Sequence, residues 1–297
     1  MTTPIILVHG GAGRIAREAS ATVLAGVQRA AEHGRAVLQG GGSAEEAVVA
    51  AVRVLEDDPV FNAGRGACMT IDGTFEMDAG IMRSIDMRSG AVAAVPAVRN
   101  AIELARLVMS GEHRLVAGEG AVRMARAAGI GFFGRDEVWT EKAERRYAKA
   151  RANLDDRHGQ ADTVGAVALD RNGNTATACS TGGVLLKAPG RVGDSPLCGA
   201  GFYAAPELGA ACATGLGEAI LTHVASYEVL RRIQDGTAPE EAARSVCERV
   251  ADGGRATCGL IVVVPDERVA VAHASQHMSW ALARGDEPID SGLSRHP

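Results

Sequence analysis

The chain has 297 residues, of which 46% are hydrophobic and 23% charged, with a formal net charge of −5 at pH 7. This composition is that of a globular protein with a substantial core, and the acidic balance argues against a nucleic-acid binder, which needs a basic face. No apolar stretch approaches the ~20 residues of a membrane-spanning helix, so we expect no membrane partner.

The first part of the chain predicts a strand and two helices. An apolar run over residues 5–8 is stopped by HGGAG, as at the end of a buried strand. Residues 19–38 form an alanine-rich helical pattern, and Ser43 with Glu46 makes a capping box for a second helix that runs to residue 55. The sequence LEDDPVFNAGRGA then predicts a structured loop.

Short elements fill the middle of the chain. Residues 68–71 and 74–77 flank an Asp-Gly pair, which predicts a β-hairpin. Further expected elements are strands at 91–95 and 114–117 and helices at 100–109, 119–128 and 140–152. The polar run NLDDRHGQAD, residues 153–162, has almost nothing apolar to anchor it, so we expect an exposed, mobile segment.

A clean hairpin follows this polar run. Residues 163–169 and 175–179 are strand patterns joined by Asp-Arg-Asn-Gly-Asn, whose Asn-Gly pair fits a tight turn. The last expected elements are helices at 217–233 and 239–250 and strands at 260–264, 268–273 and 278–282. Strands in hairpins and helices in pairs predict an α+β fold with helices outside two packed sheets.

Thr163 stands where the polar run ends and the strand begins. A threonine hydroxyl is a weak nucleophile until a base takes its proton, and the α-amine of an N-terminal threonine can be that base. This amine titrates at roughly pH 7.7–8.0 in peptides, which suits neutral pH. The chemistry requires a cut between Asp162 and Thr163; otherwise Thr163 is an ordinary strand residue, and the segment alone leaves both interpretations open.

Other residues could serve such a nucleophile. Thr181 ends the paired strand, so the hairpin should bring it near Thr163. Arg191 and Asp194 in GRVGDSP suit the carboxylate and ammonium of a zwitterion, or a surface salt bridge. Thr214 and Gly215 in TGLGE stand where a helix should begin, and they could form an oxyanion hole or an N-cap.

With these motifs in order, the chain resembles the plant-type (type III) L-asparaginase and isoaspartyl peptidase family of N-terminal-nucleophile (Ntn) hydrolases. The resemblance covers the whole chain through HGGAG, LEDDPVFNAGRGA, DTVGAVALDRNGNTATACSTGG, GRVGDSPLCGAGFYA and TGLGE. It implies one Ntn-hydrolase domain over residues 1–297, folded as a four-layer αββα sandwich. It also implies self-cleavage into an α chain (1–162) and a β chain (163–297), assembly as an (αβ)2 homodimer, and release of L-aspartate from L-asparagine and β-aspartyl (isoaspartyl) dipeptides.

The resemblance also implies a role for each matching residue. Thr163 would be the nucleophile, with Asp162–Thr163 as the bond that it cuts. The other assignments are Thr181 orienting the nucleophile, Arg191 holding the substrate α-carboxylate, Asp194 holding the α-ammonium, Thr214 and Gly215 stabilising the oxyanion, Gly217 completing the substrate site, and Asn62 approaching from the α chain.

No cofactor is expected for catalysis. The resemblance implies a structural sodium ion on main-chain carbonyls, at the matching positions Leu55, Glu56, Asp58, Phe61, Ala63 and Arg65. A well-packed loop without metal is the alternative, because oxygen ligands suit a hard cation without identifying it.

Several alternatives stay open. Many members of the family carry glycine before the nucleophile, whereas Asp162 is also common in glycosylasparaginases, which act on N4-glycosyl-asparagine; the tryptophans, Trp139 and Trp280, do not match the N-terminal one that those enzymes use. An inactive member that does not cleave itself is another alternative. An α/β-hydrolase would need G-x-S-x-G, and a nucleotide-binding module would need a glycine fingerprint in its proper context; neither occurs.

Localisation is predicted from the cysteines and the first residues. The six cysteines include no C-x-x-C pair, and MTTPIILVHGGAG lacks the basic and long apolar regions of a signal peptide. We therefore expect reduced thiols in a cytoplasmic enzyme with a small-molecule substrate.

Overall fold

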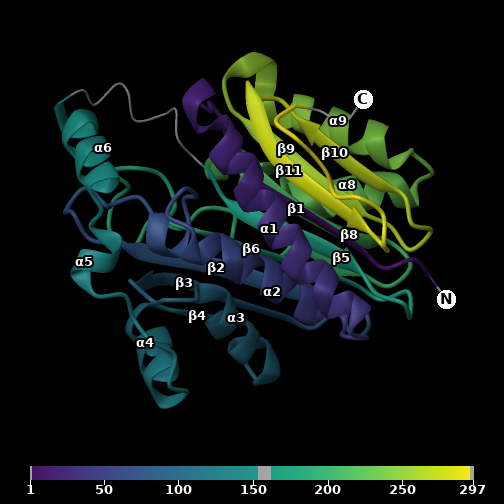
Figure 1. The fold of residues 1–297 in the computed structure, drawn as a ribbon, viewed down its shortest axis with the longest axis horizontal. Coiled ribbons are helices and arrows are strands. Elements are labelled where there is room, and N and C mark those ends of the chain that lie inside the picture. The colour runs from purple at the N-terminus through teal and green to yellow at the C-terminus, as the bar shows by residue number, and fades with distance from the viewer. Residues whose placement is uncertain (1, 153–161, 295–297) are drawn as a thin grey trace.

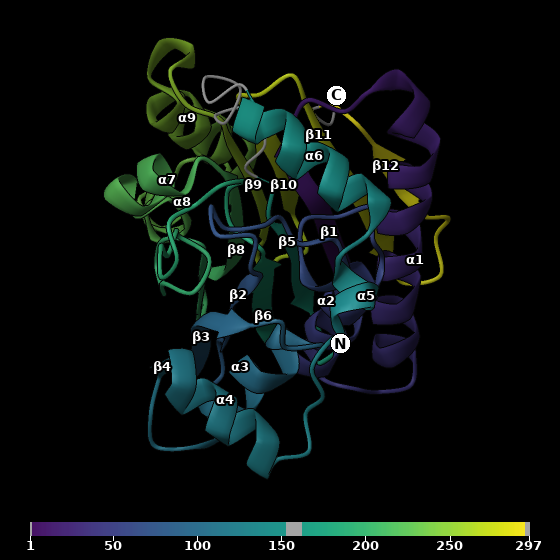
Figure 2. The same ribbon diagram turned by 90° about the vertical axis from the view of Figure 1, so that its left-hand side faces the viewer.

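The computed structural model describes residues 2–152 and 162–294, and it has four layers. Helices α1 (Ser20–Gln39) and α2 (Ala44–Asp57) cover one side, and α8 (Ala225–Gln234) and α9 (Pro239–Ala251) cover the other. Two β-sheets lie between these helix pairs, as Figure 2 shows. The α+β sandwich predicted from the sequence is confirmed.

Within the described residues, one sheet has eight strands and the other has four. The larger has the order β12-β11-β1-β5-β6-β2-β3-β4, and the smaller has the order β10-β9-β8-β7. The larger sheet contains β1 (Ile5–Gly13), β2 (Glu76–Arg83), β3 (Ser89–Pro96), β4 (Leu115–Ala117), β5 (Val164–Leu169), β6 (Thr175–Thr181), β11 (His277–Arg284) and β12 (Asp290–Gly292). The smaller contains β7 (Phe202–Ala205), β8 (Gly209–Gly215), β9 (Cys258–Val263) and β10 (Val269–His273).

The remaining helices lie around the sandwich. In Figure 1, α3 and α4 lie below the β3–β4 end of the larger sheet, and α6 projects at the upper left. Their bounds are α3 (Ala101–Ser110), α4 (Gly118–Ala127), α5 (Arg135–Val138), α6 (Glu141–Ala152) and α7 (Gly217–His223), with short 3-10 turns η1 (Arg17–Ala19), η2 (Gly64–Gly66) and η4 (Asp252–Gly254).

Large apolar side chains fill the layer between the two sheets, and a glycine makes room for one of them. Leu7, Phe202 and Ile261 are fully buried in the layer between them. Gly80 makes room for one of these, because a Cβ there would lie 2.0 Å from Cε1 of Phe202. Burying a large apolar side chain contributes about 1.5–3 kcal/mol to stability, so this layer holds the strands that carry the site.

The β5–β6 hairpin places two of the predicted site residues at one end of the central strands. Its register pairs Val164 with Ser180, so Thr163 and Thr181 stand at the same end. At the other end Asp170 closes the predicted turn, where its Oδ1 accepts from the N–H groups of Asn172 (2.9 Å) and Asn174 (3.1 Å).

The hairpin predicted over residues 68–77 is wrong. Residues 68–75 contain no strand beyond an isolated bridge between Thr70 and Lys187, and β2 begins only at Glu76. Thr70 closes the Asp-Gly turn locally: its N–H donates to the Thr74 carbonyl (2.8 Å), and its Oγ1 accepts from the Thr74 N–H (3.1 Å). The Asp-Gly pair therefore marks a turn without paired strands around it.

Other boundaries also differ from the expected ones. The helix predicted over 217–233 is broken at Val224, whose φ of 48° is left-handed, and α7 and α8 result. Thr214 and Gly215 end strand β8 rather than begin a helix. The strands β7, β8 and β12 were not predicted. Of the segment expected to be mobile, residues 153–161 lie outside the described residues.

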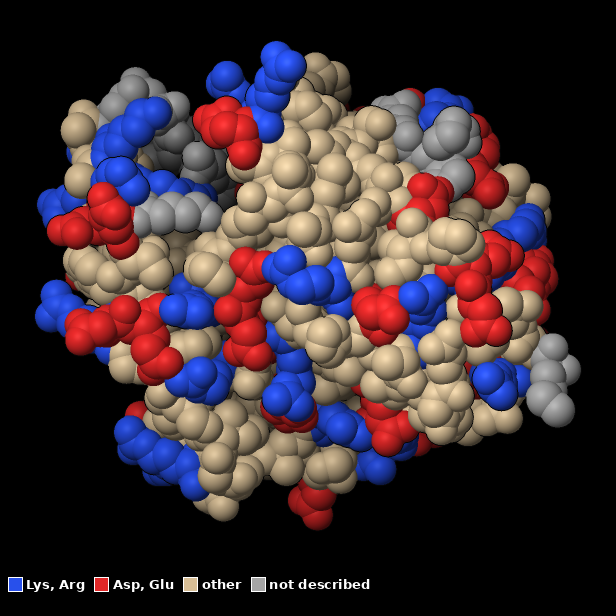
Figure 3. Space-filling view, in the orientation of Figure 1, with Lys and Arg blue, Asp and Glu red and all other residues tan. Residues whose placement is uncertain are grey.

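The surface shows no gathering of one charge on the face drawn in Figure 3, where acidic and basic side chains alternate. Several ion pairs of the chain lie within one helix, such as Arg244 with Glu241 and Glu248 on α9. Within residues 2–152 and 162–294, no helix combines the length and apolar character needed to cross a membrane.

Candidate active site

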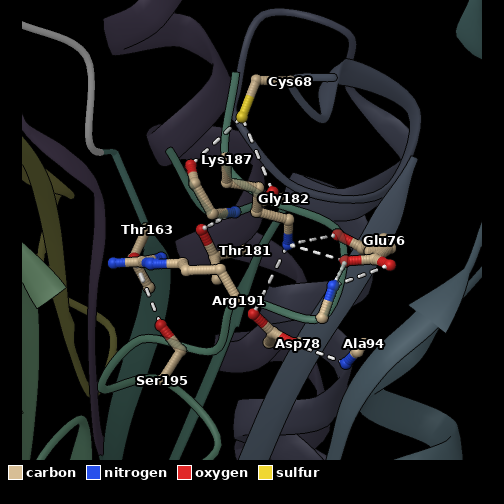
Figure 4. Close-up of polar contacts among 12 residues, drawn as sticks. Cys68, Glu76, Asp78, Ala94, Thr163, Thr181, Gly182, Lys187, Arg191 and Ser195 are labelled. Atoms are coloured by element: carbon tan, nitrogen blue, oxygen red, sulfur yellow. Dashed lines mark hydrogen bonds and ion pairs between the residues drawn. The ribbon is translucent and has the colours of Figure 1, made fainter. Parts of the chain in front are cut away.

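Thr163 lies in a buried position between the two sheets, directly before β5. Its backbone is tied to β8: the Thr163 N–H donates to Oγ1 of Thr214 (3.2 Å), and that hydroxyl donates to the Thr163 carbonyl (3.2 Å). The Thr163 side chain points the other way, with Oγ1 3.2 Å from Oγ of Ser195 (Figure 4). The hydroxyl is therefore held in a defined place at the end of a rigid strand.

The carbonyl of Asp162, one bond before Thr163, is held by two side-chain donors. Asn62 Nδ2 donates to it at 2.8 Å, and Thr181 Oγ1 donates at 3.3 Å. Donors placed on a carbonyl oxygen stabilise the negative charge that develops when a nucleophile attacks the carbon. Asp162 and Thr163 thus present a polarised carbonyl and a fixed hydroxyl next to each other.

Asn62 and Thr181 are themselves held by their surroundings. Asn62 Oδ1 accepts from the Cys68 N–H (2.9 Å), and Nδ2 also donates to the Gly183 carbonyl (2.7 Å). Thr181 Oγ1 accepts from the Gly183 N–H (3.0 Å). Gly183, with a φ of +81°, therefore links the two donors, and its left-handed backbone favours glycine.

The glycine-rich loop HGGAG packs against the side chain of Asp162. A Cβ at Gly11 would lie 2.8 Å from the Asp162 Cβ, and one at Gly13 would lie 2.9 Å from Asp162 Oδ1. The loop therefore needs glycine because another segment passes close to it.

Arg191 lies at the pocket with its guanidinium turned to Glu218. Its Nε and Nη2 donate to the two carboxylate oxygens at 2.9 and 2.7 Å, a bidentate pair. Gly217 is needed beside this pair, because a Cβ there would lie 2.8 Å from Arg191 Nη2 and 3.0 Å from Asp194 Oδ1. The fork is oriented by a surface carboxylate before any ligand arrives.

Asp194 is buried, and within the described part of the chain its Oδ2 has no hydrogen-bond partner. Burial raises the pKa of this carboxyl to about 7, against the nearby charge of Arg191, which lowers it. A buried carboxyl oxygen without a partner costs free energy unless a ligand satisfies it, so Asp194 is suited to receive a cation such as an ammonium.

Gly215 closes the site from β8. Its φ is +135°, and a Cβ would lie 2.2 Å from the Thr257 carbonyl, so only glycine fits. Most of the predicted catalytic and substrate-binding residues line one pocket, while Thr214 and Asn62 contact the lining residues Thr163 and Asp162. The pocket is lined by Asp162, Thr163, Thr181, Gly183, Val184, Arg191, Gly193, Asp194, Ser195, Gly215 and Gly217.

Buried charges behind the pocket hold the loop that carries Arg191. The Lys187 ammonium is fully buried, donates to the Glu76 carbonyl (3.1 Å) and lies 3.8 Å from Asp78 Oδ2 (Figure 4). The Glu76 carboxylate accepts from the Gly190 N–H at 2.9 Å. These contacts fix the stretch from Lys187 to Gly190, which directly precedes Arg191.

Sequence reasoning missed Ser195, Lys187 and Glu218. Ser195 directly follows Asp194, and that adjacency was the one available signal. Lys187 and Glu218 resemble ordinary surface charges in the sequence, and only the fold shows that the first is buried and that the second faces Arg191.

The positions predicted to hold sodium run from the last turn of α2, which contains Leu55 and Glu56, into the loop that follows it. A Cβ at Gly64 would lie 2.4 Å from the Glu56 carbonyl oxygen, and one at Gly66 would lie 1.9 Å from that of Phe61. The side chain of Glu56 is buried, and its carboxylate accepts a hydrogen bond from Ser180 Oγ (2.6 Å). Burial raises the pKa of this carboxyl to about 8. The carbonyls of Glu56 and Phe61 therefore pack directly against two glycines of this loop.

Comparison with known proteins identifies relatives along the whole chain. A family model described as Asparaginase matches residues 2–292. The isoaspartyl peptidase/L-asparaginase of Danio rerio is 42% identical over 286 residues, which are 95% of this chain and 92% of the relative. The Homo sapiens protein of the same name is 41% identical over 99% of both chains. The plant-type L-asparaginase of Pyrobaculum calidifontis is 42% identical over 96% of both.

Proposed function

This chain belongs to the asparaginase family, and we propose that it is an autoprocessing threonine hydrolase that releases L-aspartate from L-asparagine and β-aspartyl dipeptides. The observation that carries this is the Asp162–Thr163 bond, whose carbonyl is held by two donors beside a buried hydroxyl. The names of the relatives, isoaspartyl peptidase/L-asparaginase and plant-type L-asparaginase, favour this activity over a glycosylasparaginase.

The first step is the cut that creates the active enzyme. Thr163 Oγ1 attacks the Asp162 carbonyl, and Asn62 and Thr181 stabilise the oxyanion that forms. The resulting ester is hydrolysed by water, giving an α chain of residues 1–162 and a β chain of residues 163–297. The cut frees the Thr163 amine, which can then act as the base for its own hydroxyl.

Substrate binding uses the far side of the pocket. Arg191 holds the α-carboxylate of the substrate. To do so, its guanidinium either releases the Glu218 carboxylate or binds both carboxylates together. Asp194 pairs its free Oδ2 with the α-ammonium. These two contacts direct the side-chain carbonyl of the substrate towards Thr163, while Gly217 leaves the space between them.

Hydrolysis then follows the same chemistry on the substrate. Thr163 Oγ1 attacks the side-chain amide or isopeptide carbonyl, and Thr214 and Gly215 stabilise the oxyanion. For this role the Thr214 hydroxyl turns from the Thr163 carbonyl, to which it donates in the uncut chain. Ammonia or an amino acid leaves, and water hydrolyses the β-aspartyl ester to aspartate. Thr181, released from the departed Asp162 carbonyl, orients the nucleophile. Losing one oxyanion donor typically raises such a barrier by about 3 kcal/mol.

The function is tested by assaying the cut protein with L-asparagine and with a β-aspartyl dipeptide. We expect L-aspartate from both, with ammonia from the first and a free amino acid from the second. Cut protein that releases aspartate from neither substrate would contradict the proposal, and release from a glycosylated asparagine alone would favour the glycosylasparaginase alternative.

The pH dependence of kcat/KM should reflect the protonation of the Asp194 carboxyl. Its pKa of about 7 lies above the ordinary range, so the carboxyl gains a proton as pH falls through 7 and loses its attraction for the ammonium. The free Thr163 amine, with the pKa of roughly 8 that is usual for an α-amine, also gains a proton as the pH falls. We expect kcat/KM to fall steeply below pH 7, and Asp194→Asn to lower it by about 10²-fold while removing one of the two proton dependences. An unchanged pH profile in that variant would remove Asp194 from the substrate site.

We further propose that the last turn of α2 and the loop after it hold a sodium ion by the carbonyls of Leu55, Glu56, Asp58, Phe61, Ala63 and Arg65. Main-chain carbonyl oxygens suit a hard cation, and those of Glu56 and Phe61 lie close to two glycines of this loop. Replacing sodium by choline at constant ionic strength should lower Tm, and an equal Tm in both salts would argue for a metal-free loop.

The enzyme is also proposed to be an (αβ)2 homodimer. Sedimentation equilibrium of the cut protein can test this assembly by measuring its mass.

A further inference from the structure

Ser195 contacts the reacting hydroxyl but has no part in the roles assigned above. Its side chain is buried, and its Oγ lies 3.2 Å from Thr163 Oγ1. Its backbone is also fixed, because its carbonyl accepts from the Cys179 thiol at 3.0 Å. Gly201 packs on it, where a Cβ would lie 2.7 Å from the Ser195 Cα. The serine hydroxyl therefore stays beside the nucleophile.

In the uncut chain the groups assigned to the mature nucleophile are engaged elsewhere. The Thr163 nitrogen is an amide, and its lone pair is delocalised into the Asp162 carbonyl, so it cannot act as a base. Its N–H donates to Thr214 Oγ1. The Thr181 hydroxyl donates to the Asp162 carbonyl and accepts from the Gly183 N–H. Ser195 is the contact that the structure gives to the Thr163 hydroxyl at this stage.

We propose that Ser195 is a catalytic residue of the maturation cut. Its Oγ accepts the hydrogen bond of the Thr163 hydroxyl in the uncut chain and so directs a free lone pair of that oxygen to the Asp162 carbonyl carbon. After the cut, the free amine becomes available as a base and Thr181 is released from the Asp162 carbonyl, so hydrolysis depends on Ser195 less than the cut does. The inference rests on the proposed function and assigns to it a residue needed more for the cut than for hydrolysis.

The step balances without any added reactant except water. A bond forms between Thr163 Oγ1 and the Asp162 carbonyl carbon, and the peptide C–N bond breaks. The hydroxyl proton ends on the Thr163 nitrogen, which leaves as an amine. Water then hydrolyses the ester, giving the Asp162 carboxylate and restoring the hydroxyl. Ser195 keeps its own proton throughout.

The test separates maturation from hydrolysis in one preparation. Wild type, Ser195→Ala and Ser195→Thr are made by cell-free translation with a short radioactive pulse, and the two fragments are followed on denaturing gels. The fragments that finally form are assayed for aspartate release per cut chain. Ser226→Ala is the matched control, because Ser226 is a fully buried serine on α8 whose Oγ has no partner among the described residues.

We expect Ser195→Ala to cut about tenfold more slowly, the scale of one lost hydrogen bond, with a smaller loss in kcat of the cut enzyme. Ser195→Thr should restore the cut, and Ser226→Ala should cut normally. Cutting of Ser195→Ala at the wild-type rate would overturn the inference, and so would an equal loss of cutting and kcat. Equal damage by alanine and threonine would indicate packing and overturn it too. A wild-type chain that never cuts would instead refute the proposed function itself.

Discussion

The Thr163→Ala chain is expected to stay whole and to release no aspartate from either substrate. Alanine removes the hydroxyl that would form both esters, the one with Asp162 and the one with substrate, while leaving the backbone bonds to Thr214 in place. Removing a covalent nucleophile costs about 10⁴-fold or more in turnover, so the residual rate should be close to the uncatalysed one. Denaturing gels and an aspartate assay measure the two losses separately.

Thr163→Ser is the control for this substitution. It keeps the hydroxyl within reach of Ser195 and removes only a methyl group, so some cutting and hydrolysis should remain. If Thr163→Ala were cut between residues 162 and 163, or were active, another nucleophile would be at work. The assignment of Thr163 would then have to be abandoned for whichever reaction persisted.

Arg191→Ala is expected to raise KM for L-asparagine by about 10²-fold or more while leaving the maturation rate nearly unchanged. The guanidinium is the fork proposed to bind the substrate carboxylate, and a lost charge pair in a partly buried site costs about 2–5 kcal/mol. Maturation should not need it, because the hydrogen bonds of its guanidinium within the described residues go to Glu218. Steady-state kinetics on fully cut protein gives KM, and gels of fresh protein give the cutting rate.

Arg191→Lys distinguishes charge from geometry at the same position. Lysine keeps the positive charge but loses the planar fork, so its KM should lie between those of wild type and Arg191→Ala. If Arg191→Ala slowed maturation as much as it weakened substrate binding, the residue would have a folding role instead, together with Lys187 and Glu76, which hold the same loop.

The sequence predicted the parts of the site that depend on local patterns. The Asn-Gly turn between β5 and β6 fixes the hairpin that puts Thr163 and Thr181 at one end, and this arrangement could be anticipated from residues 163–181 alone. By contrast, the Asp-Gly turn at residues 72–73 carries the same signal, yet Thr70 satisfies its hydrogen bonds without a second strand. A turn motif therefore does not by itself establish the pairing around it.

Long-range contacts account for most of what was missed. The strand β8 consists largely of alanine and glycine, whose small side chains carry no clear alternation, and β7 has only four residues. Both pack against strands of the larger sheet, a contact that no local pattern reveals. Asn62 lies 100 residues before the carbonyl that it contacts. Its placement was available only through resemblance, and no sequence pattern could show that it shares that carbonyl with Thr181 or that Ser195 faces the nucleophile.

Intact mass spectrometry of the purified wild-type protein after incubation tests the central claim most directly. The account predicts two fragments that meet between Asp162 and Thr163 and whose masses sum to that of the chain plus one water. The second fragment should begin with a free threonine amine. A single stable mass of 30.6 kDa would contradict it, because the base proposed for hydrolysis would never be formed.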